Sequence, residues 1–223
     1  MTLRPPLLLV AAALAACAPA AAADNVVEAP AATRTAQESG GLKAAYFAGG
    51  CFWGVEAVFS HVRGVTSAVS GYHGGNRATA NYDRVSSGVT GHAETVRVIY
   101  DPAQVRYDEL LRIFFSVVAD PTLRDRQGPD RGSQYRAALI PVDAEQRAVA
   151  AAYLSQMRAS GVWQRPIVTE IERPREFFVA EDEHQDFARR NPRHGYIQRW
   201  DAPKVTALAR LFPGHYRATF RNG

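Results

Sequence analysis

The chain has 223 residues, of which 47% are hydrophobic and 22% charged, and its formal net charge is +4 at pH 7. This is the composition of an ordinary soluble globular protein with enough apolar residues for one core. The length fits one domain or two small ones. The charge is mild and long blocks of like charge are absent, which argues against nucleic-acid binding.

The first residues have the pattern of an export signal. Arg4 precedes an apolar run from about Leu7 to Ala16, which is too short to span a bilayer and has the length of a secretory hydrophobic region. Residues 14–17 (LAAC) resemble a bacterial lipobox, which would make Cys17 the lipidated first residue of a mature lipoprotein. Residues 18–23 also offer Ala-x-Ala sites for an ordinary signal peptidase.

We therefore expect a signal peptide over residues 1–23, or a lipoprotein signal ending at residue 16. Both predict export to the bacterial periplasm or cell envelope, with membrane attachment only through a lipid on Cys17. An unprocessed tail is the remaining alternative. Residues 24–42 lack hydrophobic periodicity and are interpreted as a flexible spacer. A single domain is expected over residues 43–223.

Hydrophobic periodicity and turn residues predict the elements of this domain. In chain order they are a strand at 44–48, a helix from about 51 to 62, strands at 66–72 and 94–100, a helix at 107–118, a strand at 135–142, a helix at 143–161, a strand at 167–171, and helices at 176–190 and 203–211. Long polar loops separate them at 76–92 and 120–134. This order favours an α+β fold, a two-layer sandwich with a mixed sheet and a ferredoxin-like split βαβ core.

Cys51 is the only cysteine that remains once Cys17 is removed or lipidated. An exported protein usually pairs its cysteines, so an unpaired thiol indicates either a buried inert residue or a reactive one. Cys51 follows a glycine pair at a predicted junction between strand and helix. The free N–H groups of a helix N-terminus favour thiolate over thiol.

Two further features surround this thiol in the sequence. Phe52 and Trp53 follow it directly, and the helical pattern places only one of the two rings in the core, which leaves the other for an apolar ligand group. The long polar loops carry candidate functional side chains, since such loops in compact domains are often functional. These are His73, Tyr82, His92, Glu94, Asp130 and Tyr135.

Several motifs resemble those of the A-type peptide methionine sulfoxide reductases. They are GCFWG at 50–54, GYHGG at 71–75, TGHAE at 90–94 followed by YDP at 100–102, DPT at 120–122, QGPDRGSQYR at 127–136 and AEDEHQ at 180–185. The motifs occur in the family's order and cover roughly residues 43–212. The resemblance implies an enzyme that reduces the S epimer of methionine sulfoxide, free or in oxidised proteins.

The resemblance also implies a role for each matching residue. Cys51 matches the nucleophile and Glu94 the proton donor, which requires burial to raise the pKa of its carboxyl. The other matching residues are Tyr82 and Tyr135, which bind the sulfoxide oxygen, Phe52 and Trp53, which hold the methyl group, Asp130, which lies near the substrate backbone, and His184, whose role is either substrate binding or structural. No metal, nucleotide or other bound cofactor is implied.

One position departs from many relatives. A resolving cysteine often follows the stretch that reads NPRHGY here, but Ile197 stands at that place, and the tail with DAPK at 201–204 resembles members without resolving cysteines. An internal disulfide step is therefore unavailable to Cys51. We expect an external thiol reductant, either a thioredoxin-like protein or a small thiol.

Two other functions fit the residues less well. A cysteine hydrolase or acyltransferase would need His73, His92 or His184 within hydrogen-bond reach of the Cys51 sulfur, together with an oxyanion hole. A non-enzymatic envelope lipoprotein that only binds oxidised or methionine-rich partners would not need the thiol at all.

Overall fold

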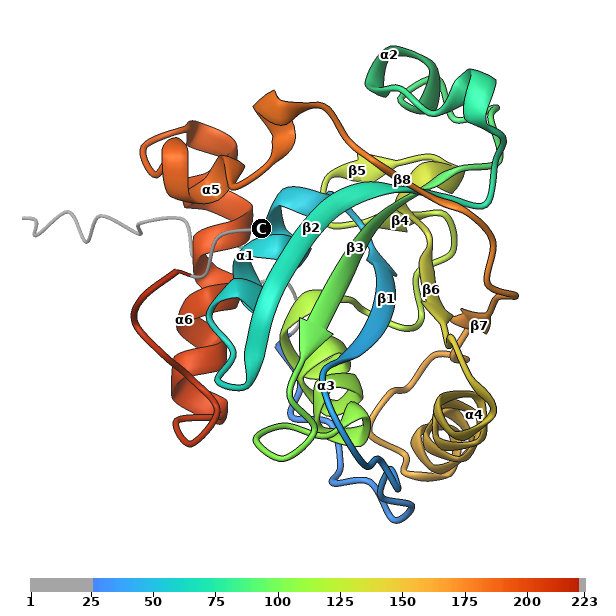
Figure 1. Ribbon diagram of the computed structural model, residues 1–223, viewed down its shortest axis with the longest axis vertical. Coiled ribbons are helices and arrows are strands. Elements are labelled where there is room, and N and C mark those ends of the chain that lie inside the picture. Colours follow the sequence, from blue (N-terminus) through green and yellow to red (C-terminus); the bar gives the residue numbers. More distant parts are fainter. Residues whose placement is uncertain (1–25, 221–223) are drawn as a thin grey trace, which may run out of the picture.

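The computed structural model describes residues 26–220, and the predicted export signal with Cys17 lies outside this range. A six-stranded sheet in the order β7-β6-β1-β3-β2-β8 forms the centre of the fold (Figure 1). Its strands are β1 (Lys43–Gly49), β2 (Val65–His73), β3 (Ala93–Tyr100), β6 (Ala137–Ile140), β7 (Glu170–Ile171) and β8 (Phe177–Val179). A separate two-residue hairpin pairs β4 (Arg126–Gln127) with β5 (Asp130–Arg131).

The four inner strands have the connectivity of a split βαβ unit. Strand β3 lies between β1 and β2 and is antiparallel to both, so β1 and β2 run in the same direction with a gap filled by β3. Strand β6 is antiparallel to β1 on its other side. Strand β8 adds antiparallel to β2 at one edge, and β7 adds parallel to β6 at the other. The predicted α+β fold with a mixed, ferredoxin-like sheet is confirmed.

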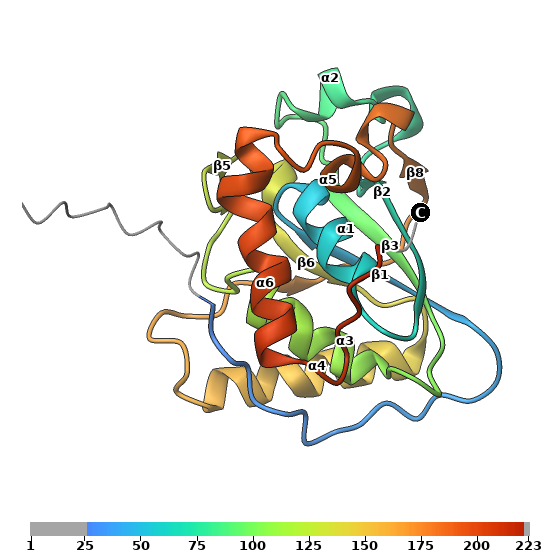
Figure 2. The same ribbon diagram turned by 90° about the vertical axis from the view of Figure 1, so that its left-hand side faces the viewer.

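The long helices form the second layer. Helix α1 (Phe52–Ser60) packs on the sheet, α6 (Ala202–Leu211) packs on α1, and α3 (Tyr107–Ile113) continues as a π-helical turn over Phe114–Val118 (Figure 2). Helix α4 (Ala144–Ala159) packs against α3, and its N-cap is Asp143, whose side chain accepts a hydrogen bond from the Gln146 N–H. The core lies between the layers, where Phe47 of β1 stacks on Phe59 and contacts Phe114.

The prediction of a helix over residues 176–190 is wrong. Its first part is strand β8, which approaches β2 so closely that a Cβ on Gly71 would lie 2.3 Å from the Phe178 carbonyl oxygen. The rest holds only a 3₁₀ turn (Asp182–His184) and the short helix α5 (Phe187–Arg190). Asp186 has φ of 51°, a left-handed conformation that no continuous right-handed helix contains.

Three smaller differences concern the strand ends and the polar loops. Only Glu170–Ile171 of the predicted strand at 167–171 pairs with the sheet, and β6 is shorter than predicted because Tyr135 lies in a 3₁₀ turn. The loop at 76–92 contains a 3₁₀ turn (Arg77–Thr79) and the short helix α2 (Tyr82–Val85). Within residues 26–220, no helix is long and apolar enough to cross a membrane.

The described part of the predicted spacer, residues 26–42, is packed on the domain. Ala29 and Ala36 are buried, and their N–H groups donate to Ser116 Oγ and to an Asp108 carboxylate oxygen at 2.9 and 2.8 Å. Glu38 accepts a hydrogen bond of 3.0 Å from the Tyr107 N–H. The prediction of a flexible spacer is wrong for these residues, because small alanines and backbone N–H groups find partners without any hydrophobic periodicity.

Deleting residues 1–41 should therefore lower stability relative to a chain that begins at Val26. The lost alanine burial and hydrogen bonds amount to about 2 kcal/mol or more, which corresponds to a fall of roughly 4–8 °C in Tm for a chain of this length. Thermal unfolding followed by circular dichroism measures the difference. Equal Tm values for the two chains would show that the segment contributes no stability.

Candidate active site

Cys51 lies at the turn between β1 and α1. Gly50 has φ of 91°, and a Cβ at this position would lie 2.5 Å from the Cβ of Gln127, so glycine is required for both the turn and the close packing. Cys51 is the N-cap of α1, and its carbonyl oxygen accepts a hydrogen bond of 3.2 Å from the Gly54 N–H. Cys51 is 9% exposed and belongs to the buried core cluster, so its thiol lies at the margin of the core.

Glu94 extends from the central strand β3 toward the start of α1. The Phe52 N–H donates a 2.9 Å hydrogen bond to Glu94 Oε2, and the side chain is buried. Burial is the main cause that raises the pKa of Glu94 to about 8, the charges of Asp130 and Asp201 act in the same direction, and the hydrogen bond from the Phe52 N–H acts against them. The prediction that burial keeps this carboxyl protonated near neutral pH is supported by its surroundings.

The Cys51 thiol does not behave as its helix position alone predicts. Burial raises the pKa of Cys51 well above its usual value, and the charges of Glu94 and Asp201 act in the same direction. The hydrogen bond from the Trp53 backbone lowers it, as expected at a helix N-terminus, but does not outweigh burial. The resting side chain at neutral pH is therefore a thiol, because burial outweighs the effect of the helix N-terminus that the sequence analysis describes.

Two tyrosines reach the same site from opposite loops. Tyr82 begins α2 and Tyr135 ends the 3₁₀ turn Ser133–Tyr135. Burial raises the pKa of both phenols, and the nearby charge of Glu94 contributes to each shift. Both hydroxyls therefore stay protonated and can donate hydrogen bonds. Asp130 on β5 belongs to the same cluster, since its charge also raises the pKa of Glu94.

The two aromatic residues after Cys51 point to different surroundings. Phe52 is fully buried, with its ring centroid 5.8 Å from that of Tyr72, whereas Trp53 is partly exposed. Trp53 stacks on Phe187 of α5 with ring centroids 3.7 Å apart, and its Nε1–H donates a 3.3 Å hydrogen bond to His184 Nδ1. As predicted, only one of the two rings lies in the core.

His184 occupies a central place among these rings. It is 7% exposed, and its ring centroid lies 4.3 Å from that of Tyr82 and 5.3 Å from that of Phe52. Together with the hydrogen bond from Trp53, these contacts make it a support for the aromatic wall. The carboxylate of Glu181 adds a second support, because it accepts a 3.0 Å hydrogen bond from the Tyr82 N–H.

Sequence reasoning missed four residues of this site. Tyr196 donates a hydrogen bond to Asp130 Oδ2, Phe187 covers Trp53, and Asp201 and Lys204 form an ion pair close to the start of α1. In the sequence, the NPRHGY and DAPK stretches indicate only that a resolving cysteine is missing. Phe187 was assigned to a helix that does not form, so nothing in the periodicity marked it as a ring partner.

The three histidines of the hydrolase hypothesis have other partners. His73 Nε2 accepts a 3.0 Å hydrogen bond from the Arg175 N–H, and His92 bonds to Gly75 and Asn76 through its two ring nitrogens. His184 Nδ1 bonds to the Trp53 indole. None of these bonds orients an imidazole toward the Cys51 sulfur, so the geometry disfavours a hydrolase.

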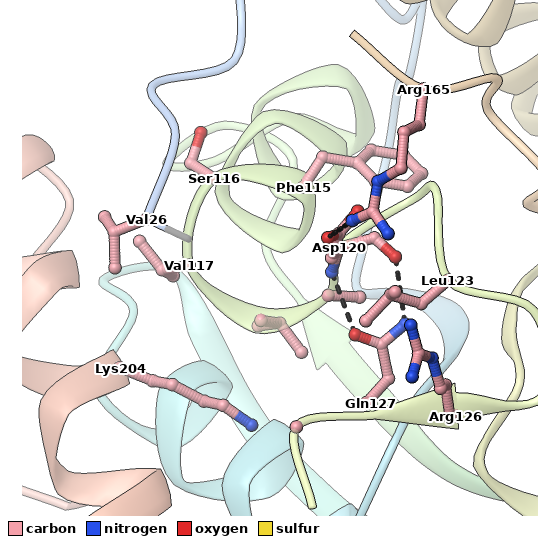
Figure 3. Close-up of a pocket in the computed structure, with 13 residues that line it drawn as sticks. Val26, Phe115, Ser116, Val117, Asp120, Leu123, Arg126, Gln127, Arg165 and Lys204 are labelled. Carbon is pink, nitrogen blue, oxygen red and sulfur yellow. Dashed lines mark hydrogen bonds and ion pairs between the residues drawn. The ribbon is translucent and has the colours of Figure 1, made fainter. Parts of the chain in front are cut away.

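A cavity of about 270 Å³ lies next to this site, and Cys51 does not line it (Figure 3). Gln127 stands in its wall, exchanges two 2.9 Å hydrogen bonds with the Asp120 backbone, and packs its Cβ against Gly50. Lys204 extends into the cavity from α6, and Arg165 pairs with Asp120 across it. In the part of the chain that the structure describes, no group of His, Cys, Asp and Glu is arranged to hold a metal ion.

Comparison with known proteins identifies the class. The family model described as "Peptide methionine sulfoxide reductase" matches residues 43–213, and the chain belongs to this family. The chain is 48% identical over 195 residues to "Peptide methionine sulfoxide reductase MsrA 2" of Synechocystis sp., which covers 87% of this chain and 90% of that protein. The particular branch is therefore the A-type, as the sequence motifs indicate.

Solved structures agree with this assignment. "Methionine sulfoxide reductase A of Corynebacterium diphtheriae" is 34% identical, with a TM-score of 0.58 over 69% of this chain and 77% of that one. Mxr1 from Saccharomyces cerevisiae in reduced form is 29% identical, with a TM-score of 0.61 over 73% of this chain and 92% of that one. The sheet and helix layers described above are thus those of the family.

The buried carboxyl predicts a pH dependence of stability. The folded state holds the Glu94 proton up to about pH 8, whereas the ordinary value is 4.5, so the folded state binds more protons between these limits and stability falls as pH rises. Between these pH limits, the titration of Glu94 should lower the free energy of unfolding by about 1.4 kcal/mol per pH unit. Glu94→Gln should remove this contribution.

Urea unfolding at several pH values between 5 and 8 measures the slope. Glu183→Gln, which changes an exposed glutamate of the same 3₁₀ turn as His184, is the matched control and should keep the wild-type slope. Equal slopes for Glu94→Gln and the wild type would contradict a buried, protonated Glu94.

Proposed function

We propose that this protein reduces the S epimer of methionine sulfoxide, free or in oxidised proteins, to methionine, with Cys51 as nucleophile and Glu94 as proton donor. The observation that carries the proposal is the hydrogen bond from Phe52 N–H to Glu94, the buried carboxyl beside the Cys51 turn. The family's chemistry needs this pairing of a sulfur nucleophile with a neutral acid. The epimer preference rests on the A-type resemblance.

The reaction balances with these two groups alone. The Cys51 sulfur attacks the sulfoxide sulfur, and the sulfoxide oxygen takes the proton of Glu94, because it cannot leave as oxide. The protonated oxygen then passes from the substrate sulfur to the Cys51 sulfur as the bond between the two sulfurs breaks. The electron pair of that bond returns to the substrate sulfur, methionine is released, and Cys51 is left as a sulfenic acid. The thiol proton replaces the one that Glu94 donated. Cys51 is oxidised by two electrons and the substrate sulfur is reduced by two.

The surrounding side chains fit the three parts of the substrate. The protonated phenols of Tyr82 and Tyr135 offer hydrogen bonds to the sulfoxide oxygen without adding charge. Phe52 and the exposed side of Trp53 offer an apolar surface for the methyl group. Asp130 accepts a hydrogen bond from the Tyr196 hydroxyl, and its carboxylate can accept another from the substrate backbone.

Regeneration requires a thiol from outside the chain. Cys51 is the free cysteine of the described residues, and residues 52–223 contain no second cysteine. One external thiol condenses with the sulfenic acid to form a mixed disulfide and water, and a second thiol releases Cys51 with formation of the external disulfide. A thioredoxin-like protein or a small thiol can supply both, and no bound cofactor takes part.

The place of action follows from the first residues of the sequence. The apolar run of residues 7–16 and the LAAC stretch support export to the bacterial periplasm or cell envelope, with a lipid on Cys17 as the one candidate membrane attachment. Oxidised envelope proteins would then be the substrates of this repair activity.

Without reductant, the protein should convert only one equivalent of substrate. Cys17→Ser protein, in which Cys51 is the only thiol, is incubated with a racemic methionine sulfoxide peptide with and without dithiothreitol. We expect one equivalent of methionine and a sulfenic acid on Cys51 without reductant, and half of the racemate consumed with it. Repeated turnover without reductant, or none under either condition, would contradict the proposal. Cys51→Ser should be inactive, since an alcohol is a far weaker nucleophile.

Glu94→Gln should keep the shape of the site but lose the proton donor. We expect kcat/KM to fall about 10²- to 10⁴-fold, the usual contribution of a general acid. Single-turnover formation of the Cys51 sulfenic acid, followed by mass spectrometry, isolates this step from regeneration. An unchanged single-turnover rate would remove Glu94 from the mechanism and leave another group as the acid.

A further inference from the structure

Asp201 and Lys204 form a buried ion pair at the start of α6. The Asp201 side chain is fully buried and that of Lys204 is 8% exposed, and Nζ lies 3.6 Å from Oδ1. Removing two charges from water costs free energy, so a buried ion pair of this kind need not stabilise the fold. We therefore expect a role of the pair in the active site.

The pair lies against the first turn of α1. A Cβ at Gly54 would be 2.2 Å from Asp201 Oδ1 and 3.2 Å from Lys204 Nζ, so only glycine leaves room for the carboxylate. Gly54 is also the residue whose N–H bonds to the Cys51 carbonyl. The pair therefore touches the turn that sets the position of the thiol.

The two charges face different surroundings. Lys204 lines the cavity described above and extends into it from α6 (Figure 3). The Asp201 carboxylate lies closer to α1 than the amine does. The carboxylate is thus the closer of the two charges to Gly54 in the first turn of α1.

Other ionisable groups face the carboxylate from each element around it. Lys204 comes from α6, Cys51 from the start of α1 and Glu94 from β3, while Tyr196 precedes the π-helical turn Ile197–Asp201. The charge of Asp201 raises the pKa of Cys51, Glu94 and Tyr196. Asp130 acts in the same direction on Cys51 and Glu94.

We propose that Asp201 and Lys204 are a positioning pair for the reaction proposed above: they seat the first turn of α1 and set the charge beneath the Cys51 thiol. The benefit of the pair to catalysis rests on the proposed function, whereas its effect on the ionisation of Cys51 does not. The anion favours the proton on Glu94, which the acid needs, and holds Cys51 as a thiol until substrate arrives. Lys204 limits this effect, so that the thiol can still give up its proton.

The test measures the ionisation of Cys51 without any sulfoxide. Full-length protein is alkylated with iodoacetamide across a pH series, and the rate at Cys51 is read by mass spectrometry after proteolysis. Asp201→Asn should move the midpoint of the rate to lower pH by about one unit or more, because a shift of one unit needs only about 1.4 kcal/mol of interaction between the carboxylate and the thiolate. Lys204→Met should move it to higher pH, because the carboxylate loses its cation.

Two controls separate this effect from general damage. Lys204→Arg keeps the cation and should keep the wild-type midpoint, and Asp143→Asn makes the same change as Asp201→Asn at the N-cap of α4, where asparagine caps equally well. Thermal unfolding identifies any variant that does not fold, and the Lys204 variants then decide the test. Unmoved midpoints in the folded variants, or a downward shift in Lys204→Met, would overturn the proposal.

Turnover of the sulfoxide peptide is measured separately. If the midpoints shift as expected while the wild type reduces no sulfoxide, the positioning pair stands and the proposed function fails. If the wild type is active and the midpoints do not move, the function stands and the pair is only structural. When both hold, the alkaline fall of kcat/KM should move to lower pH in Asp201→Asn, since Glu94 then loses its proton earlier.

Discussion

The 2.9 Å hydrogen bond from the Phe52 N–H to Glu94 joins the helix layer to the sheet beside the Cys51 thiol. Glu94 belongs to the central strand β3, and Phe52 is the first residue of the helix that carries Cys51 as its cap. A free N–H of a helix start must be satisfied when it is buried, and here a carboxyl satisfies it. The same bond brings the acid next to the thiol, so the fold and the chemistry depend on one contact.

Burial has the same effect on both partners, because it raises the pKa of each group, but the two groups need different protonation states for the reaction. It keeps the proton on Glu94, as an acid requires, but it also keeps the proton on Cys51, which a nucleophile must lose. The helix N-terminus works against burial only through the Trp53 backbone. A resting thiol beside a neutral acid leaves the protein with a sulfur that is protected from indiscriminate oxidation, because oxidation follows thiolate character.

Local sequence patterns predicted the sheet core and the centre of the site, but not its outer wall. The junction at Gly50 and Cys51, the split βαβ order and the capping of α4 by Asp143 all follow from spacing and residue type. The strand β8 was missed because Phe177 and Phe178 pair with an edge whose access depends on Gly71, a contact between segments far apart in the chain. The helical periodicity at 176–190 could not reveal the left-handed conformation of Asp186, which interrupts the predicted helix.

The segment around Ile197, where many relatives carry a resolving cysteine, has a structural role in this chain. Ile197 is 3% exposed and begins the π-helical turn that leads into α6, which packs on α1. A resolving thiol has to reach the sulfenic sulfur, whereas this segment is fixed by burial on the helix that carries Cys51. The π-helical turn and α6 also carry Asp201 and Lys204, which lie against the first turn of α1. In this chain the C-terminal segment therefore supports the turn that holds the thiol. In the reaction proposed above, regeneration of Cys51 is therefore left to a thiol from another molecule.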